Sequence, residues 1–180
     1  MSDRLKQLRL ALKSRSLDGV IVSRLPHIRY ISGFSGSAGV LVVTQKNATV
    51  VTDFRYMDQV AAELKTGFTS LIHTRNPYEE IITAGLLTPG MNVGFQDSAV
   101  SVAGYDSMRK MLRKVKLEKS GDMVAALVKV KSDEEVKSIR KAANIAAKVY
   151  AEVLKIAKPG VRENELAMEI GYLGRKFGSE

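Results

Sequence analysis

Residues 33–52 read GFSGSAGVLVVTQKNATVVT and join a glycine-serine loop to two apolar runs. Glycines occupy every third position of the loop 33–39, and a short polar connection separates the runs Val40–Thr44 and Ala48–Thr52. Two runs rich in β-branched residues with so tight a connection predict a β-hairpin. Because hairpin strands are antiparallel, this segment indicates that the sheet of the protein is mixed and not wholly parallel.

Helical and strand patterns alternate on both sides of this hairpin. Apolar spacing and boundary residues predict the helices Arg4–Arg15, Tyr56–Leu64, Val102–Val115, and a helix from Pro77 to near Gly90 with Asn76 as its N-cap. Short apolar runs predict the strands Gly19–Ser23, Ser70–Thr74 and Asn92–Phe95, and apolar stretches at Leu117 and Val124–Val130 close the series. We therefore expect an α/β fold in which a mixed β-sheet is flanked by helices.

The pattern becomes wholly helical toward the C-terminus. Ser132 and Glu135 have the spacing of a capping box, and the apolar stripe that follows predicts a helix of about 25 residues ending at Lys158–Gly160. A second amphipathic helix follows, with its apolar residues spaced over 166–177. Two amphipathic helices cannot bury their apolar faces against each other alone.

These helices divide the chain into two parts. We expect a first domain at residues 1–130, followed at residues 131–180 by the first two helices of a second domain that is incomplete in this chain. Two alternatives are that the helices fold back onto the first domain or that they dimerise.

The composition limits the partners of the protein. The chain has 28 Lys and Arg against 19 Asp and Glu, a net charge of +9, and this excess is spread over both parts of the chain. The densest basic run, Arg109–Lys116, interleaves apolar residues, so a solvated helix face explains it better than a phosphate-binding track. We expect no nucleic-acid partner and, without a run of about 18 apolar residues, no membrane partner. The absence of cysteine is typical of a reducing cytoplasm.

The glycine-serine loop is not expected to bind a nucleotide. Phosphate-binding glycine motifs follow a strand and open a helix, whereas this loop runs into the strand at Val40 and contains no lysine. The glycines could let the backbone approach a ligand closely, or they could form a tight turn between a short helix and a strand.

No catalytic constellation stands out from the residues themselves. The two histidines, His27 and His73, are far apart in sequence, and no pair has the spacing of metal ligands. Ser35 and Ser37 do not lie in a nucleophile elbow. We therefore name no catalytic and no metal-binding residue.

The segment Thr52–Tyr56 allows two interpretations. It follows a predicted strand, which is where α/β proteins often present ligand contacts, and Arg55 could hold a carboxylate through a forked pair of hydrogen bonds. In the other interpretation, Asp53 caps the next helix and Arg55 pairs with it locally.

Taken together, three segments resemble the Xaa-Pro aminopeptidase (aminopeptidase P) and prolidase family. The segments are Arg29–Gly39, Thr52–Tyr56 and Lys131–Val161, in this order and spacing. The resemblance covers nearly the whole chain, and its more specific part is the glycine-serine loop combined with the Thr-Asp-x-Arg-Tyr pattern. The sequence departs from relatives at Phe54, where they usually carry Gly, and at Arg162, where they often place a Thr cap.

The resemblance implies a two-domain metallopeptidase. In this family a creatinase-type N-terminal domain precedes a pita-bread catalytic domain that holds two divalent ions, commonly manganese, through two Asp, one His and two Glu. A metal-bridging hydroxide attacks the carbonyl before proline. All five ligands correspond to positions downstream of Glu180, so the resemblance places no metal ligand in this chain and implies that the chain alone is not catalytic.

The resemblance also implies roles for the N-terminal domain, which serves oligomerisation and walls the active-site cleft. The implied partners are proline-containing peptides and a second copy in a homodimer. We expect Arg55 to face the cleft and Asp53 to orient Arg55 or Tyr56. Phe34, Ser35 and Ser37 are expected to line the cleft.

Two other functions remain open at this stage. Some pita-bread relatives have lost the metal ligands, so a non-catalytic peptide- or protein-binding module is one alternative, and a nucleic-acid-binding domain is the other. Neither the choice between aminopeptidase and dipeptidase nor the native metal follows from these residues.

Overall fold

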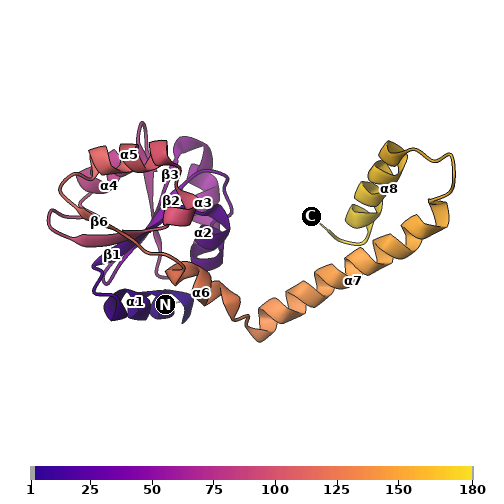
Figure 1. Cartoon of the computed structure of the whole chain (residues 1–180), viewed down its shortest axis with the longest axis horizontal. Coiled ribbons are helices and arrows are strands. Elements are labelled where there is room, and N and C mark those ends of the chain that lie inside the picture. The colour runs from indigo at the N-terminus through magenta and orange to yellow at the C-terminus, as the bar shows by residue number, and fades with distance from the viewer. Residues whose placement is uncertain (1–2, 180) are drawn as a thin grey trace. The chain divides into compact units, whose positions relative to one another are not determined.

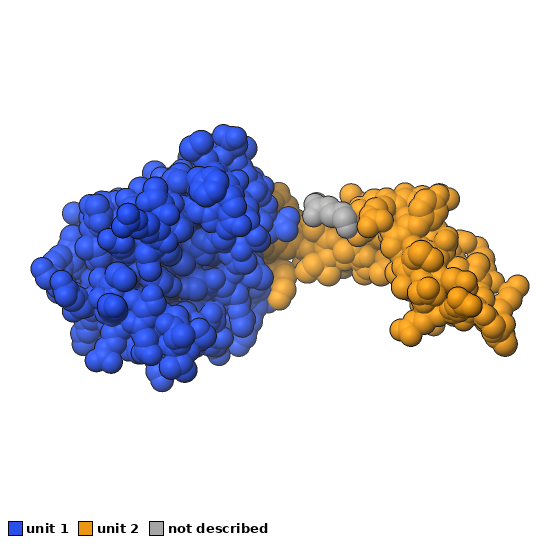
Figure 2. All heavy atoms as spheres, turned by 90° about the horizontal axis from the view of Figure 1, so that it is seen from above, with its two compact units in different colours: residues 1–130 blue, residues 131–180 orange. Residues whose placement is uncertain are grey.

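The computed structural model describes residues 3–179, and these divide into two compact units between Val130 and Lys131. Figure 1 shows the elements along the chain, and Figure 2 colours the two units separately. None of the helices within residues 3–179 is both long enough and apolar enough to cross a membrane.

The first unit is built on a six-stranded sheet, and its mixed strand directions confirm the prediction from the sequence. Its strands are β1 (Gly19–Val22), β2 (Val40–Thr44), β3 (Ala48–Asp53), β4 (Thr69–His73), β5 (Asn92–Phe95) and β6 (Lys116–Lys119). The order across the sheet is β4-β3-β2-β1-β5-β6. β2 pairs antiparallel with β1 and β3, whereas the pairs β3–β4, β1–β5 and β5–β6 are parallel. Five strands therefore point the same way, and the hairpin supplies the reversed one.

Helices cover both faces of this sheet (Figure 1). The helices are α1 (Asp3–Ser14), α2 (Leu25–Ser32), α3 (Met57–Glu63), α4 (Pro77–Thr83), α5 (Val102–Met111) and α6 (Met123–Lys129), with short 3₁₀ turns η1 (Phe54–Tyr56) and η2 (Asp97–Ala99). Apolar residues of α1, α2, α3 and α6 join one core cluster, and those of α4 and α5 join the other.

Alternation along the central strands explains why both faces are covered. In β1, Val20 and Val22 belong to the first cluster and Ile21 to the second, and all three are fully buried. Successive strand residues point to opposite faces, so a strand that is apolar at every position must lie between two layers. The helix stripe of α1, made of Leu5, Leu8 and Leu12, is also fully buried.

Two helices end earlier than their sequence pattern predicted. α4 ends at Thr83 and is followed by Gly85, whose φ of 66° lies in the left-handed region. α5 ends at Met111, and the next residues form a turn that leads into β6; in this turn the Lys114 carbonyl accepts the Gly90 N–H at 2.8 Å. Tertiary pairing therefore overrides the helical spacing at the end of α5.

The second unit is a pair of helices, α7 (Asp133–Ile156) and α8 (Glu163–Lys176). The predicted capping box is confirmed, since the Glu135 N–H donates to Ser132 Oγ and the Ser132 N–H donates to Glu135 Oε2. Both helices leave large apolar side chains exposed: Val136, Ile139, Tyr150, Leu154, Ile156, Met168, Ile170 and Tyr172.

Candidate functional site

The strand directions gather the candidate residues at one edge of the sheet. β1, β3, β4, β5 and β6 all end there, and β2 begins there, so the loop 33–39 and the turn after β3 meet. Thr52 Oγ1 donates to the Ala38 carbonyl at 2.7 Å and ties the two segments together. The carboxyl ends of parallel strands are the usual place for ligands in open α/β sheets, so we take this edge as the candidate site.

The loop begins at a helix end that requires glycine. Gly33 terminates α2 with a φ of 93°, and its N–H donates to the Arg29 carbonyl. A Cβ atom at this position would lie 2.7 Å from the Glu63 carbonyl oxygen. Ser32 then accepts the Phe34 N–H at its Oγ, 3.2 Å away. The backbone conformation and the close approach of α3 thus both favour glycine at this helix end.

Glu63 of α3 holds the exposed side of the loop. Its carboxylate accepts the Ser35 N–H at Oε2 and the Ser35 hydroxyl at Oε1, each at 2.7 Å. Gln59 donates to Glu63 Oε1 and to Ser35 Oγ, both at 3.0 Å. The Ser35 N–H, followed by the Ser35 and Gln59 side chains, lowers the pKa of Glu63. No sequence motif marks Glu63 as a site residue, although its place one helix turn after Gln59 is visible in the sequence.

Two aromatic rings pack against the buried side of the loop 33–39. Phe34 is 1 % exposed, and its ring meets Tyr56 edge-to-face with centroids 5.8 Å apart. Gly36 lies against both rings. Ser37 Oγ and the Tyr56 hydroxyl are 2.5 Å apart. The serine hydroxyls therefore lie on the exposed side, whereas Phe34 lies in the core beneath them.

Asp53 and Arg55 form a closed local pair. Asp53 Oδ1 accepts the Arg55 N–H as the cap of η1, and the guanidinium donates from Nε and Nη2 to the two carboxylate oxygens at 2.9 and 2.8 Å. The Arg55 side chain is 59 % exposed, and its guanidinium carbon lies 5.3 Å from the centroid of the Tyr56 ring. The side-chain bonds from Arg55 lower the pKa of Asp53 to about 2, and the same bonds raise the pKa of Arg55.

This pair gives an acid-titration prediction. The folded-state pKa of Asp53 lies below its ordinary value of 3.8, so the pair is intact above pH 4 and is lost as the pH falls toward 2. NMR titration of the Asp53 carboxyl carbon should show a midpoint near 2. In an Arg55→Lys variant, which cannot form the forked pair, the midpoint should move up toward 3.8. An unchanged midpoint in that variant would contradict the assigned cause.

The structure adds a buried polar cluster at the same edge that the sequence analysis did not identify. Gln96 follows β5, and its Oε1 accepts the N–H groups of Ser23 and Arg24 after β1 at 3.0 and 3.1 Å. Gln96 Nε2 lies 2.7 Å from His27 Nδ1. Burial, and then the nearby Arg24 charge, lowers the pKa of His27. One feature of the sequence could have indicated this cluster: His27 and Gln96 each follow a predicted strand.

The other histidine lies elsewhere on the edge. His73 ends β4 and is in register with Asp53 of β3, while His27 belongs to the helix after β1. The sheet order places β3 and β2 between β4 and β1. The two histidines therefore do not form a pair, and residues 3–179 contain no group of three His, Cys, Asp or Glu side chains that could hold a metal ion.

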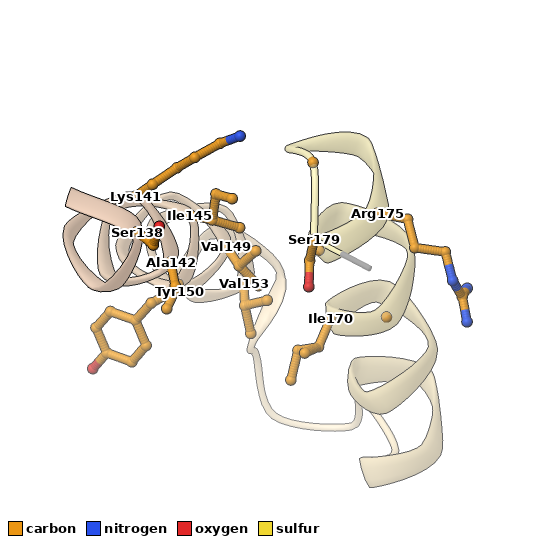
Figure 3. A pocket seen from close by; sticks show the side chains of 14 residues that line it. Ser138, Lys141, Ala142, Ile145, Val149, Tyr150, Val153, Ile170, Arg175 and Ser179 are labelled. Carbon is orange, nitrogen blue, oxygen red and sulfur yellow. The ribbon is translucent and has the colours of Figure 1, made fainter. Parts of the chain in front are cut away.

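The second unit carries an apolar groove between its helices. Figure 3 shows Ile145, Val149 and Val153 of α7 pointing toward α8, and Ile170 of α8 pointing toward α7. Arg175 points away from the groove. Aliphatic side chains thus form the centre of the groove, and Ser138, Lys141, Tyr150, Arg175 and Ser179 also line it.

Comparisons with known proteins match the whole chain to proteins named as peptidases, one of them an Xaa-Pro dipeptidase. A family model described as the Creatinase/Prolidase N-terminal domain matches residues 4–127. The chain is 28 % identical to "Uncharacterized peptidase YqhT" of Bacillus subtilis over 181 residues, which are 98 % of this chain and 50 % of that protein. It is 24 % identical to "Xaa-Pro dipeptidase" of Pyrococcus horikoshii over 184 residues, which are 100 % of this chain and 50 % of that protein.

A solved structure gives the same result. The Xaa-Pro dipeptidase from Bacillus anthracis superimposes with a TM-score of 0.87 at 27 % identity, over 98 % of this chain and 49 % of that one. The chain thus spans about half the length of the relatives it matches along its whole extent.

Proposed function

The chain belongs to the creatinase/prolidase N-terminal domain family, and from this premise we propose that it is the N-terminal portion of a metal-dependent peptidase that hydrolyses the bond before proline. The observation that carries the proposal is the likeness of the whole chain to one half of proteins named Xaa-Pro dipeptidase. In this proposal the portion is not itself catalytic; it walls the active-site cleft and serves oligomerisation in a homodimer. The lack of cysteine fits a cytoplasmic protein.

The proposed wall is the carboxyl edge of the sheet. The Ser35 and Ser37 hydroxyls are exposed there, and Glu63 and Tyr56 hold them in place before any ligand arrives. Such preorganisation reduces the cost of ordering a loop on binding. Phe34 contributes from beneath, as the support of the loop.

Arg55 is the proposed recognition group for a peptide carboxylate. A guanidinium has five N–H donors, and Asp53 engages only the Nε and Nη2 groups. The side chain is more than half exposed, so its remaining donors are open to a ligand. In this role, Asp53 fixes the plane of the guanidinium.

The helices α7 and α8 are proposed to be the start of the pita-bread catalytic domain. Their exposed apolar side chains and the groove between them support this assignment, since such surfaces are stable only when another layer covers them. The two metal ions implied by the family, commonly manganese, find no fitting group of ligands within residues 3–179. No catalytic step is therefore assigned to this chain.

A chimera tests the proposed function. Residues 1–130 would replace the matching segment of the Pyrococcus horikoshii Xaa-Pro dipeptidase, and hydrolysis of an Xaa-Pro dipeptide would be followed with added metal. We expect the chimera to cleave and the 180-residue chain alone to be inactive. Arg55→Ala in the chimera should raise KM by about ten- to hundredfold, because a charge-assisted bond contributes roughly 1.5–3 kcal/mol.

Lys46→Ala is the matched control, because it removes one positive charge, as Arg55→Ala does. Lys46 lies in the hairpin connection between β2 and β3, at the opposite end of the strands from Arg55. Equal effects of the two substitutions would exclude a specific role for Arg55. Cleavage by the 180-residue chain alone would contradict its non-catalytic role. A folded, metal-loaded chimera that binds the dipeptide without cleaving it would favour a non-catalytic binding module.

A further inference from the structure

We infer that His27 and Gln96 form a proton-sensitive latch that fixes the start of α2 and, through α2, the glycine-serine loop. The inference rests on the geometry of the sheet edge and not on the proposed peptidase role. It assigns a regulatory function to a buried pair that no catalytic or binding proposal uses.

The Gln96 side chain can take only one orientation. Its Oε1 accepts two backbone N–H groups, from Ser23 and Arg24, at 3.0 and 3.1 Å. Turning the amide over would place its NH₂ group against those two donors. Nε2 must therefore be the donor toward His27 Nδ1, 2.7 Å away. This geometry requires neutral His27 with its proton on Nε2.

Protonation of His27 breaks this arrangement. A proton on Nδ1 would face the Gln96 NH₂ group, so two donors would meet in a space where Gln96 is 3 % and His27 is 8 % exposed. The amide cannot turn to accept the proton without losing the N–H groups of Ser23 and Arg24. Burial, and then the Arg24 charge, disfavour the imidazolium and lower the pKa of His27 while it is bonded to Gln96.

The surroundings offer no compensating partner among the described residues. β2, which packs on α2, has no charged side chain, and the charged residues at the two ends of α6, Asp122 and Lys129, are exposed. Asp97, next to Gln96, accepts the Gly121 N–H at 3.0 Å. Tyr78 of α4 lies beside Ser23, and burial raises the pKa of its phenol, so it stays uncharged when His27 titrates.

The helix connects this pair to the loop. His27 lies in the first turn of α2, and Ile28 and Ile31 anchor the helix in the core with no exposed surface. At the other end, the Ser32 carbonyl accepts the Lys65 N–H at 3.0 Å and Ser32 Oγ accepts the Phe34 N–H. Because α2 has only eight residues, we expect a displacement of its first turn to strain the packing of Ile28 and Ile31 and to reach Ser32, from which the loop starts.

Hydrogen exchange of the whole chain tests the latch. Protection factors, which remove the intrinsic pH dependence of exchange, would be measured for the amides of Ser23, Arg24 and Ser35 between pH 7.5 and 5. We call the state with the bond between His27 and Gln96 closed and the state without it open. If the pKa of His27 is near 6.5 in the open state and lower in the closed state, the population of the open state rises as the pH falls, by up to about tenfold per pH unit. Protection at these three amides should fall accordingly, while core amides of β2 keep theirs.

Three variants identify the groups responsible. His27→Asn keeps an acceptor near the Nδ1 position without a titrating ring, so it should abolish the pH-dependent loss. His73→Asn makes the same change at the other histidine and should leave the loss unchanged. Gln96→Glu supplies a carboxylate that accepts from Ser23, Arg24 and protonated His27, so the loss between pH 7 and 5 should disappear or reverse.

Two results would overturn the latch. One is constant protection of Ser23, Arg24 and Ser35 across this pH range in the unaltered chain. The other is a pH-dependent loss that persists in His27→Asn. Because the comparison of His27→Asn with His73→Asn suffices, the test stands even where Gln96→Glu fails to fold.

Discussion

Replacing Phe34 by alanine should lower the free energy of unfolding of the first unit by about 3–5 kcal/mol. The ring is 1 % exposed and joins the core cluster made by α1, α2 and β1–β3. Its loss leaves a cavity and also removes the edge-to-face contact with Tyr56. Urea unfolding followed by circular dichroism would measure the change.

Phe34→Leu provides the control for this prediction. It keeps most of the apolar volume and should cost less than the alanine change. The alanine variant should also raise hydrogen exchange at Ser35, because a loop without the support of the ring breaks the bond from the Ser35 N–H to Glu63 more often. A loss below about 1 kcal/mol for Phe34→Ala would show that the ring does not fill the core as described.

Replacing Gly36 by alanine should lower the free energy of unfolding by about 1–3 kcal/mol. A Cβ atom at Gly36 would lie 2.2 Å from Phe34 Cζ and 2.8 Å from Tyr56 Cδ1. Because Phe34 belongs to the core cluster and Tyr56 packs against that cluster, the loop or the rings must shift to make room for the added Cβ atom. The matched control is Gly171→Ala in α8, where a Cβ atom meets nothing within 4 Å and alanine favours the helix.

The two predictions are coupled, because the shortest contact of a Cβ atom at Gly36 is with the Phe34 ring itself. In a Phe34→Ala background, Gly36→Ala should therefore cost clearly less than it does alone. A double-mutant cycle measured by urea unfolding would give this coupling free energy. Strict additivity of the two changes would mean that the Gly36 effect arises from the Tyr56 ring or from the loop itself and not from the Phe34 ring.

The candidate site could be predicted in part. The loop 33–39 and the segment Asp53–Tyr56 attracted attention through their residues and through a resemblance, and the structure joins them by the bond from Thr52 to Ala38. The forked pair between Asp53 and Arg55 is the local arrangement that the sequence allowed. A cleft-facing role for Arg55 stays a prediction.

Other parts of the site depend on contacts between distant segments. Glu63 lies 28 residues from Ser35, and Gln96 lies 69 residues from His27. Neither pair has a motif of fixed spacing, because each forms only after the sheet has brought its strand ends together. Sequence reasoning placed Phe34 on the cleft surface, whereas the structure places its ring in the core.

The sequence alone determined the features that depend on neighbouring residues. The hairpin Val40–Asp53, the capping box at Ser132 and the two-sided burial of β1 follow from turn length, side-chain bonds over one helical turn, and a period of two. The tertiary structure alone decided the strand order, the early end of α5, and the meeting of His27 with Gln96. The physical reason is that these features are set by pairing between segments far apart in the chain, which no local pattern encodes.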